Sequence, residues 1–417
     1  MSVQAVRGMK DVMAPEVGKW QFIEATARRV FDCFGFDEIK TPVLEKTELF
    51  VRSIGETTDI VEKEMYTFAD RGGDMLSLRP EATAGVLRAY VENKLHAQPG
   101  PHRLFTIGPM FRRERPQKGR LRQFHQLNCE VLGDEGPLVD AELLVMLDHL
   151  LKELGLRNVE IVLNSLGCPE CRPAFRQALS AFLRGRAGEL CPDCQRRLER
   201  NPLRVLDCKA EGCRQAAQGA PSIAEHLCPA CADHLAQVRG MLAAAGVQYK
   251  IDPKLVRGLD YYVRTTFEAL AGDLGAQNAV AGGGRYDGLI QALGGPAEGG
   301  VGFGCGLERL ALLLADDPRW RREPALFVAA LGAGPRAWAF ELTQRLRRAG
   351  LRVEMMSQDK SLKAQMRRAD KLGARRALIV GEQELADGVA QLKDMAAAGR
   401  QEPLPLDGAF EALRKLI

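Results

Sequence analysis

Apolar residues recur at intervals of three and four positions in several segments of the chain, which is the spacing of one face of an α-helix. The pattern predicts a helix over residues 16–34 that ends at Gly35, and further helices over 139–154 and 232–245. Another helix is expected to follow Pro80 and to run to about Lys94. Packing in a core explains the apolar positions of these helices without any further role.

Shorter segments with alternating or β-branched residues predict strands between the helices. Residues 64–70 and 74–78 indicate a hairpin closed by Arg71-Gly72-Gly73. Further strands are predicted at 159–166 and 261–270.

The stretch 105–133 combines two predicted strands with a dense basic loop. Between Arg112 and Arg122 six Arg or Lys residues stand against one acid, Glu114, and the second strand alternates polar and apolar residues. If its apolar members face the core, Gln126 and Glu130 share the other face with the loop arginines. Guanidinium groups bind phosphate bidentately, so a polyanion is one candidate ligand. A solvated charged hairpin is the alternative that composition alone favours.

Two glycine-rich segments also pass from a strand into a helix. One is AVAGGGRYDGLI, and the other is VGFGCGLERLALLLA, where Gly302, Gly304 and Gly306 leave one strand face bare for a flat group. Arg309 follows in the first turn of the helix, where a surface ion pair with Glu308 or Asp316 is an equally good interpretation. A glycine run by itself is a weak signal, because tight packing also requires it.

Composition limits the class of protein. The 417 residues are 46% hydrophobic and 27% charged with a net charge of +4, which predicts two or three globular domains rather than a disordered or fibrous chain. The first residues lack the apolar core of a signal peptide, and no apolar run is long enough to span a membrane. We therefore expect a cytoplasmic location.

Eight of the eleven cysteines lie between residues 168 and 231, mostly as Cys-Pro-x-Cys pairs. Two such pairs can hold one ion tetrahedrally, so the cluster favours structural zinc, as two ions or as one ion with spare thiols. Free thiols and a redox pair are the alternatives. The candidate ligands are Cys168, Cys171, Cys191, Cys194, Cys208, Cys213, Cys228 and Cys231.

After a Pro/Arg-rich linker at 316–324, alternating strands and helices predict a small, mostly parallel sheet with covering helices. Between Glu341 and Arg376 eleven Arg or Lys residues stand against four acids. A solvated helix face is the default interpretation, but the neighbouring basic loop favours RNA contact.

Taken together, the motifs resemble those of the bacterial histidyl-tRNA synthetases, a family of class II aminoacyl-tRNA synthetases, almost from end to end. The segments TPVLE, FRRERPQKGRLRQFHQ and GFGCGLERL are similar to the three class II motifs. LVRGLDYYVRTTFE and GGGRYDGL resemble two stretches peculiar to the histidine enzymes, and SQDKSLKAQMRRADKLGARRALIVGE resembles the anticodon-binding domain.

The resemblance implies an α+β catalytic domain built on an antiparallel sheet, over residues 1–167 and 237–317. It also implies a Cys-rich inserted domain at 168–236, a C-terminal α/β anticodon-binding domain at 324–417, and a homodimer. The reaction has two steps: L-histidine and ATP form histidyl-adenylate, and histidine then passes to the 3′-terminal hydroxyl of histidine tRNA. ATP is a substrate, and Mg²⁺ accompanies it.

The resemblance also implies roles for single residues. Arg257 and Arg112 would be catalytic, because fixed cations stabilise charge on the α-phosphate. The expected ATP-binding residues are Arg112, Arg120, Phe124 and Arg309. The expected histidine-binding residues are Glu81, Ala82, Thr83, Arg112, Gln126, Glu130, Arg257, Tyr261, Tyr262 and Tyr286. Gln117 and Lys118, with Arg120, are expected at the tRNA acceptor end.

For several of these residues an ordinary structural role is the alternative. Glu81 would then be a first-turn carboxylate facing a helix dipole, and Tyr261 and Tyr262 a buried aromatic pair. The main rival for the whole chain is a catalytically silent paralogue, which serves as a regulatory subunit in histidine biosynthesis. Such paralogues usually lack the C-terminal domain and an intact Arg257 or basic loop. A stress-kinase-like tRNA sensor and a simple RNA-binding protein explain less of the sequence.

Overall fold

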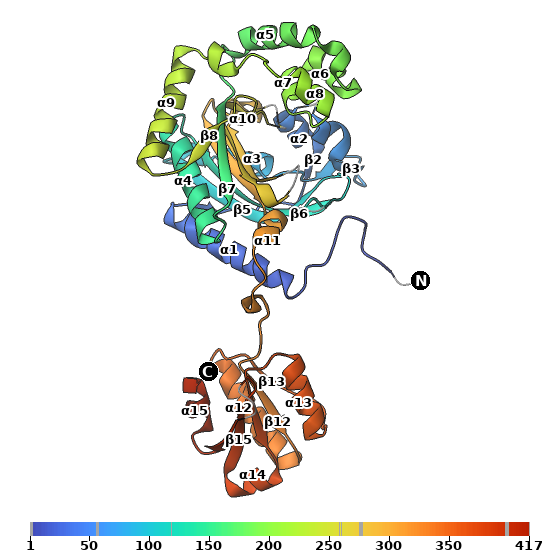
Figure 1. Ribbon diagram of the computed structural model, residues 1–417, viewed down its shortest axis with the longest axis vertical. Coiled ribbons are helices and arrows are strands. Elements are labelled where there is room, and N and C mark those ends of the chain that lie inside the picture. Colours follow the sequence, from blue (N-terminus) through green and yellow to red (C-terminus); the bar gives the residue numbers. More distant parts are fainter. Residues whose placement is uncertain are drawn as a thin grey trace. The chain divides into compact units, whose positions relative to one another are not determined.

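The computed structural model describes residues 3–55, 58–117, 119–257, 259, 261–274, 278–396 and 400–416. The chain divides into two compact units, Met1–Asp316 and Asp317–Ile417 (Figure 1). Among the described residues, none of the helices combines the length and apolar character that a membrane span requires.

The first unit is built on an eight-stranded sheet with the order β1-β5-β6-β11-β10-β9-β7-β8. The strands from β5 to β7 pair antiparallel, and only the outer pairs β1–β5 and β7–β8 are parallel. The expected antiparallel catalytic sheet is therefore confirmed. Its strands are β1 (Asp37–Glu38), β5 (His102–Phe111), β6 (Gln123–Leu132), β7 (Val159–Ser165), β8 (Tyr249–Ile251), β9 (Val263–Ala271), β10 (Ala279–Arg285) and β11 (Gly300–Gly306).

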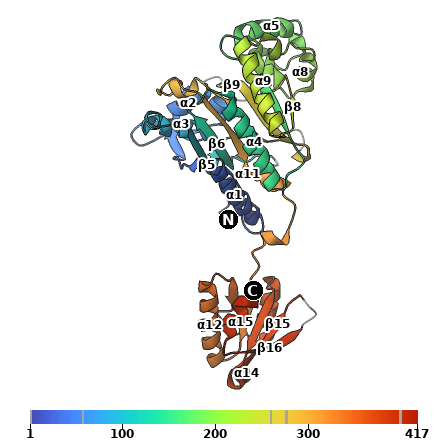
Figure 2. The same cartoon turned by 90° about the vertical axis from the view of Figure 1, so that its left-hand side faces the viewer.

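Helices cover both faces of this sheet (Figure 2). One face carries α1 (Glu16–Cys33), α4 (Pro137–Glu153), α9 (Pro229–Ala244) and α11 (Leu307–Leu313). The other face carries α3 (Thr83–Glu92) and α10 (Leu289–Ala292), with α2 (Thr47–Ile54) packed on α3. A small antiparallel sheet, β2-β4-β3, lies beside α2 and contains the predicted hairpin of β3 (Tyr66–Ala69) and β4 (Met75–Leu78), with β2 (Leu44–Lys46) at its edge.

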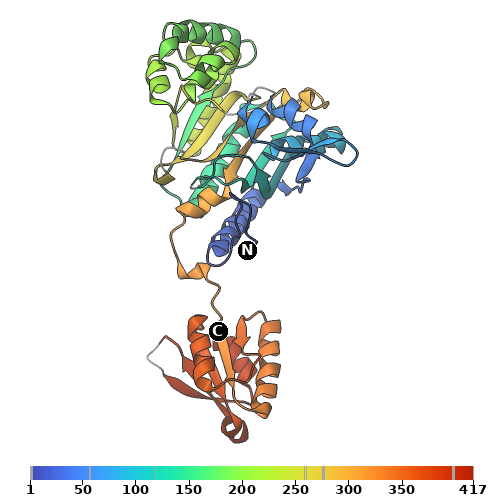
Figure 3. The same ribbon diagram turned by 90° about the vertical axis from the view of Figure 1, so that its right-hand side faces the viewer.

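The cysteine-rich segment forms a helical bundle at one end of the first unit, drawn in green in Figure 3. Its helices are α5 (Arg172–Arg184), α6 (Pro192–Arg200), α7 (Leu203–Leu206) and α8 (Glu211–Ala216). Phe175, Leu179, Leu183, Leu198 and Val205 form a buried core that is separate from that of the sheet. Since the bundle has its own core, it is an insertion rather than an extended loop.

The second unit has a five-stranded sheet with the order β13-β12-β14-β15-β16. Its first three strands are parallel, as predicted, whereas β15 and β16 are antiparallel. Parallel pairing needs a crossover of a dozen or more residues, and only residues 381–388 separate β14 from β15. The elements are β12 (Leu326–Ala330), α12 (Ala333–Arg348), β13 (Val353–Met355), α13 (Leu362–Lys371), β14 (Arg376–Val380), α14 (Glu382–Asp387), β15 (Val389–Asp394), β16 (Gln401–Pro405) and α15 (Ala409–Leu416).

A buried ionic network joins three elements of the first unit. Arg285 at the end of β10 is fully buried and donates from Nε to Asp140 Oδ1 of α4 at 3.0 Å. His234 of α9 lies 2.7 Å from the other oxygen of Asp140. Burial opposes ionisation of Asp140, but the bonds with His234 and Arg285 hold its pKa below the ordinary value.

We predict that Asp140→Ala lowers the free energy of unfolding by about 3–5 kcal/mol, because it leaves the Arg285 guanidinium buried without its main partner. Chemical denaturation of the full chain measures this change. Asp148→Ala is the matched control on the same helix, since its surface pair with Lys152 should contribute at most about 0.5 kcal/mol. Equal effects of the two substitutions would contradict a stabilising role for the buried network.

Candidate active site

The pairing of β6 with β11 sets the floor of the site. Glu130 stands opposite Gly302, Asn128 opposite Gly304, and Gln126 opposite Gly306. A methyl group at Gly302 would overlap the Glu130 carboxylate, and one at Gly304 would come within 2.8 Å of Asn128 Nδ2. The glycines therefore leave room for a row of polar side chains from β6. From the sequence, the glycines were expected only to leave space for a flat group.

The same strand turns its apolar residues to the opposite face. Leu127, Cys129 and Val131 are buried there, and the His125 ring lies 4.8 Å from that of Trp20 on α1. The predicted division of β6 into two faces is thus observed. Both faces are covered, so the alternative of a solvated hairpin does not describe this strand.

Three polar atoms of the site face are buried without a hydrogen-bond partner in the described part of the chain. They are Gln126 Oε1, Asn128 Oδ1 and Arg257 Nε. Leaving such atoms unpaired costs about 1–3 kcal/mol each, so native proteins rarely do so without a reason. Their grouping on one face indicates a place for a polar ligand.

Glu130 lies at the centre of the site and is 1% exposed. Thr83 Oγ1 donates to its Oε1 at 2.6 Å, and the Tyr286 hydroxyl donates to its Oε2. Burial raises the pKa of Glu130 to about 8, although both hydroxyls act in the opposite direction. The carboxyl group is therefore poised to exchange a proton near neutral pH.

Glu81 performs the structural role that the sequence left open. Its carboxylate accepts from the backbone N–H groups of Thr83 at 2.7 Å and Ala84 at 2.9 Å, which are the first residues of α3. This cap satisfies two donors of the helix end. Because Thr83 in turn donates to Glu130, the cap also positions the centre of the site. Ala82 is fully buried between Glu81 and Thr83.

Three tyrosines form one wall beside Glu130. The Tyr261 and Tyr262 ring centroids are 4.5 Å apart, and that of Tyr286 lies 5.7 Å from Tyr261. The aromatic pair of Tyr261 and Tyr262 is therefore observed. Tyr286 packs against this pair and contacts Glu130 through its hydroxyl.

The other end of the site is a polar pocket of about 200 Å³. It brings together six of the residues that the sequence singled out: Arg112, Arg120, Phe124, Gln126, Arg257 and Arg309. The Arg112 guanidinium lies 5.3 Å from the centre of the Phe124 ring and donates from Nε to the Pro80 carbonyl at 2.9 Å. Cations and one aromatic face are thus concentrated in one cavity.

Arg309 does not form the alternative ion pairs. It donates to the carbonyls of Ala279 and Gly119, while Glu308 accepts from the His125 backbone at 2.9 Å and Asp316 pairs with Lys19 at 2.9 Å. Its side chain is therefore held at the edge of the pocket by main-chain carbonyls.

The tip of the basic loop is only partly described. Gln117 is exposed and forms a two-residue β-bridge with Arg120, whose guanidinium donates to Glu114 at 2.8 Å. Gln117 does not line the pocket, although Arg120 does. Lys118 lies outside the described residues.

Three carboxylates line the pocket, those of Glu114, Glu268 and Glu308, and none of them was expected as a site residue. Glu268 on β9 forms an ion pair with Arg257, and Glu114 faces both Arg120 and Arg112. The sequence signal for Glu268 is its place as the last residue of the LVRGLDYYVRTTFE stretch. A methyl group at Gly282, opposite Glu268, would overlap Arg257, so this glycine has a steric reason as well.

The eight clustered cysteines separate into two groups of four, Cys168/Cys171/Cys228/Cys231 and Cys191/Cys194/Cys208/Cys213. Within each group all sulfur atoms lie within 4.8 Å of one another, and Cys168 Sγ is 3.6 Å from Cys171 Sγ. Four thiolates at 2.3 Å from a tetrahedral zinc ion would be about 3.8 Å apart. The sulfur positions therefore fit zinc in both groups.

The surroundings of the sulfurs also suit a metal. Backbone N–H groups of Cys191 and Cys228 donate to Cys213 Sγ at 3.2 Å and to Cys171 Sγ at 3.1 Å. Burial raises the pKa of the Cys171 and Cys213 thiols, and these backbone donors act in the opposite direction. The backbone bond from Cys194 lowers the pKa of the Cys191 thiol to about 7. Thiolates are the ligands that zinc binds, and a backbone N–H donor favours that form.

We predict that Glu130→Gln makes the free energy of unfolding less dependent on pH between about pH 5 and pH 8. In this window the folded wild type retains a proton on Glu130 that the unfolded chain has lost, so its stability falls as the pH rises. The contribution of one such group is at most about 1.4 kcal/mol per pH unit. Glu16→Gln, at an exposed carboxylate, serves as the control. Parallel stability curves for wild type and Glu130→Gln would contradict the raised pKa.

Comparison with known proteins identifies the family of the chain. A family profile described as "Histidyl-tRNA synthetase" matches residues 8–310, and one described as "Anticodon binding domain" matches residues 326–416. The "Histidine--tRNA ligase" of Syntrophotalea carbinolica is 55% identical over 413 residues, which cover 99% of this chain and 98% of that protein. The protein of the same name from Geobacter sulfurreducens is 56% identical over 404 residues, 97% of each chain.

A solved structure gives the same result for the fold. The crystal structure of apo S. aureus histidyl-tRNA synthetase has a TM-score of 0.82 and 34% identity, and the match covers 99% of this chain and 100% of that one. The resemblance that the motifs indicated is confirmed. The chain belongs to the histidyl-tRNA synthetase family.

Proposed function

We propose that the chain activates histidine with ATP to histidyl-adenylate, and then transfers the histidyl group to the 3′-terminal hydroxyl of histidine tRNA. Pyrophosphate leaves in the first step and AMP in the second. The observation that carries this proposal is the row of buried polar atoms of Gln126, Asn128 and Arg257 along one sheet face, which have no hydrogen-bond partner within the described part of the chain. The row joins the Glu130 environment to the cationic pocket, as a reaction between an amino acid and a nucleotide requires.

Histidine would bind at the Glu130 end. An imidazole needs one acceptor and one donor, which Glu130 and the Tyr262 hydroxyl can supply, while Tyr261 and Tyr286 enclose the ring. Gln126 Oε1 has no hydrogen-bond partner among the described residues, and it would accept from the α-ammonium group, next to Thr83 and Glu81. A wrong amino acid would leave buried polar groups unpaired, and that cost supports selectivity.

ATP would bind in the cationic pocket. The adenine would lie between Phe124 and Arg309, over the strand face that Gly304 and Gly306 keep bare. Arg112 would hold the α-phosphate together with the histidine carboxylate, Arg120 would contact the phosphates, and Arg309 would also reach the γ-phosphate. Mg²⁺ bound with ATP would supply charge to the phosphate oxygens, and Glu114 and Glu268 offer the carboxylate oxygens that this ion prefers.

Arg257 would stabilise the transition state of the first step. The histidine carboxylate attacks the α-phosphorus, the bond to the β-phosphate oxygen breaks, and pyrophosphate leaves. A guanidinium already fixed by Glu268 needs little reorganisation as charge develops on the α-phosphate. No nucleophile from the protein is required.

The remaining surfaces would serve tRNA and a second subunit. Gln117 and Lys118 at the loop tip would meet the acceptor end, and residues 324–417 with their basic helices would bind the anticodon. In a homodimer the edge strand β2 would take part in the contact, because Leu44 is 39% exposed there. Residues 1–167 and 237–317 would form the catalytic domain and 168–236 the insertion, in a cytoplasmic enzyme.

A catalytically silent regulatory subunit is the second candidate. Against it, Arg112, Arg257 and Arg309 are all present and line one pocket with Gln126. A chain that had lost catalysis would have no need to keep these cations together.

The two four-cysteine groups would each hold one structural zinc ion. The first group joins the start of the insertion to its end, and the second lies within it. Zinc in such closed sites contributes to folding rather than to chemistry.

The activity is tested by histidine-dependent exchange of labelled pyrophosphate into ATP. We expect exchange in the wild type and a loss on the order of 100-fold or more in Arg257→Ala, because a preorganised charge is removed. Arg239→Ala, at an exposed arginine of α9, is the control. Absence of exchange in the wild type would refute the synthetase, and undiminished exchange in Arg257→Ala would refute the role of Arg257.

Metal analysis of freshly purified, reduced protein tests the zinc sites. We expect about two zinc ions per chain, and about one in either Cys171→Ser or Cys194→Ser, because each group holds its own ion. Cys33→Ser, at an exposed cysteine outside both groups, should retain both ions. Zinc-free wild type would refute both sites, and a single ion in the wild type would support one site with spare thiols.

A further inference from the structure

The short helix α7 of the inserted domain packs against the tyrosine wall of the site, which Tyr261, Tyr262 and Tyr286 form. Leu203 and Leu206 of this helix pack against two apolar cores at once. One is the core of the insertion, and the other contains Tyr262 and Tyr286. The insertion is therefore continuous with the site rather than a separate appendage.

Two guanidinium groups of the insertion bind main-chain carbonyls of the site. Arg172, the first residue of α5, donates from Nη2 to the Tyr262 carbonyl and from Nε to the Leu166 carbonyl at 3.2 Å. Arg204 of α7 donates from Nη1 to the Arg257 carbonyl at 3.3 Å. Both arginines line a pocket of about 270 Å³ together with Arg257 and Tyr262. Thus the insertion contacts the main chain at both Arg257 and Tyr262.

Each of these arginines lies close in sequence to one cysteine group. Arg172 directly follows Cys171 of the first group, and α7 lies between Cys194 and Cys208 of the second. A cross-link that closes either group would limit the motion of the arginine beside it.

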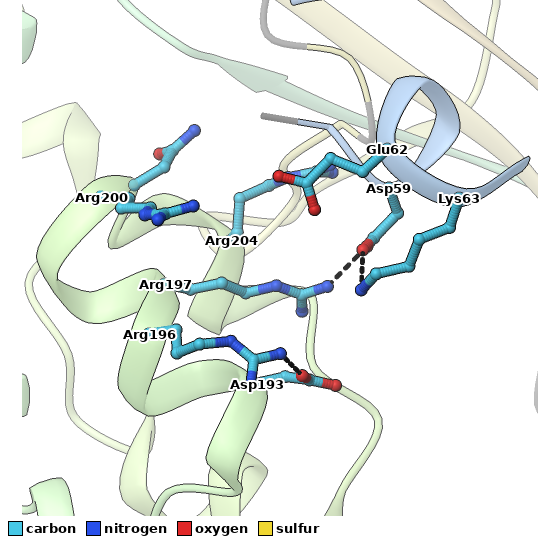
Figure 4. Close-up of a pocket in the computed structure, with 9 residues that line it drawn as sticks. Asp59, Glu62, Lys63, Asp193, Arg196, Arg197, Arg200 and Arg204 are labelled. Atoms are coloured by element: carbon cyan, nitrogen blue, oxygen red, sulfur yellow. Dashed lines mark hydrogen bonds and ion pairs between the residues drawn. The ribbon is translucent and has the colours of Figure 1, made fainter. Parts of the chain in front are cut away.

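Helix α6 also contacts the part of the first unit that lies outside the insertion. Arg197 of α6 donates to Asp59 at 2.7 Å, and Lys63, which like Asp59 lies outside the insertion, is 3.3 Å from Asp59 (Figure 4). Arg196, one residue earlier, pairs instead with Asp193 inside the insertion (Figure 4). The α6–α7 segment therefore contacts the rest of the first unit at two points, through Arg197 to Asp59 and through Arg204 to the Arg257 carbonyl.

We propose that the inserted domain positions the catalytic residue Arg257 and the histidine-binding residue Tyr262, and that Arg172 and Arg204 are the positioning residues. The two carbonyl contacts fix the backbone from which the Arg257 and Tyr262 side chains project. Arg172 would thereby govern the histidine pocket, and Arg204 the placement of the Arg257 cation. The inference rests on the proposed function, because it assigns these two side chains to histidine and to the α-phosphate.

Pyrophosphate exchange with separate titrations of histidine and ATP tests the proposal. We expect Arg172→Ala to raise the KM for histidine about ten-fold, with the KM for ATP changed less than about two-fold, because displacements near 1 Å can cost up to about 100-fold. Arg204→Ala should lower kcat about ten-fold, since it loosens Arg257. A general loss of structure would not change the KM for histidine while leaving the KM for ATP nearly unchanged.

Conservative and matched variants complete the design. Arg172→Lys keeps the charge but not the two-pronged donor geometry, so its KM for histidine should lie between those of wild type and Arg172→Ala. Arg184→Ala on α5 and Arg196→Ala on α6 remove exposed arginines that pair with Glu199 and Asp193, and both should match the wild type. Thermal unfolding midpoints identify any variant that fails to fold, and in that case Arg172→Lys carries the comparison.

The proposal would be overturned if the folded Arg172 and Arg204 variants had the kinetic constants of the Arg184→Ala control. Equal increases in the KM for histidine and for ATP would also overturn it, because they would indicate a merely structural contact. A wild type without histidine-dependent exchange would refute the proposed function instead, so the two failures are distinguishable.

Discussion

The structure of the site depends on the pairing between β6 and β11. Every second residue of β11 is a glycine, and each of these glycines stands opposite a polar residue of β6. A side chain at Gly302 would occupy the space of the Glu130 carboxylate. The register therefore creates the room in which Gln126, Asn128 and Glu130 lie side by side, and α3 supplies the hydroxyl that holds Glu130 in place. A shift of the register by one residue would exchange these polar side chains for the apolar face.

Two buried carboxyl groups on opposite faces of the sheet show how partners determine charge. Asp140 is surrounded by Arg285 and His234, and its pKa is lowered in spite of burial. Glu130 accepts from the hydroxyls of Thr83 and Tyr286, and burial raises its pKa to about 8. The first group is a paired structural ion, whereas the second can respond to a ligand. Burial alone would have made the two look alike.

The cysteine-rich insertion connects folding to the site. Two groups of four sulfurs lie among its helices, and Arg172 and Arg204 donate to the carbonyls of Tyr262 and Arg257. The proposed zinc ions would cross-link the helices of this small bundle and add to its rigidity. This arrangement gives the insertion a physical path to Arg257 and Tyr262.

Local periodicity and motif spacing were enough to predict helices α1, α3, α4 and α9, several strands, the two-faced character of β6 and the family. They did not predict α2 or the insertion helices α5 to α8. The sequence also indicated that the cysteines form pairs. Which cysteine pairs join depends on the fold, since Cys168 and Cys231 meet through chain reversal rather than proximity in sequence. The contact of Glu268 with Arg257 also depends on how separate elements pack. The Glu81 cap of α3, in contrast, is a local contact that the sequence offered as one of two roles. Periodicity specifies which face a residue takes, whereas its partner across the sheet is fixed by the fold.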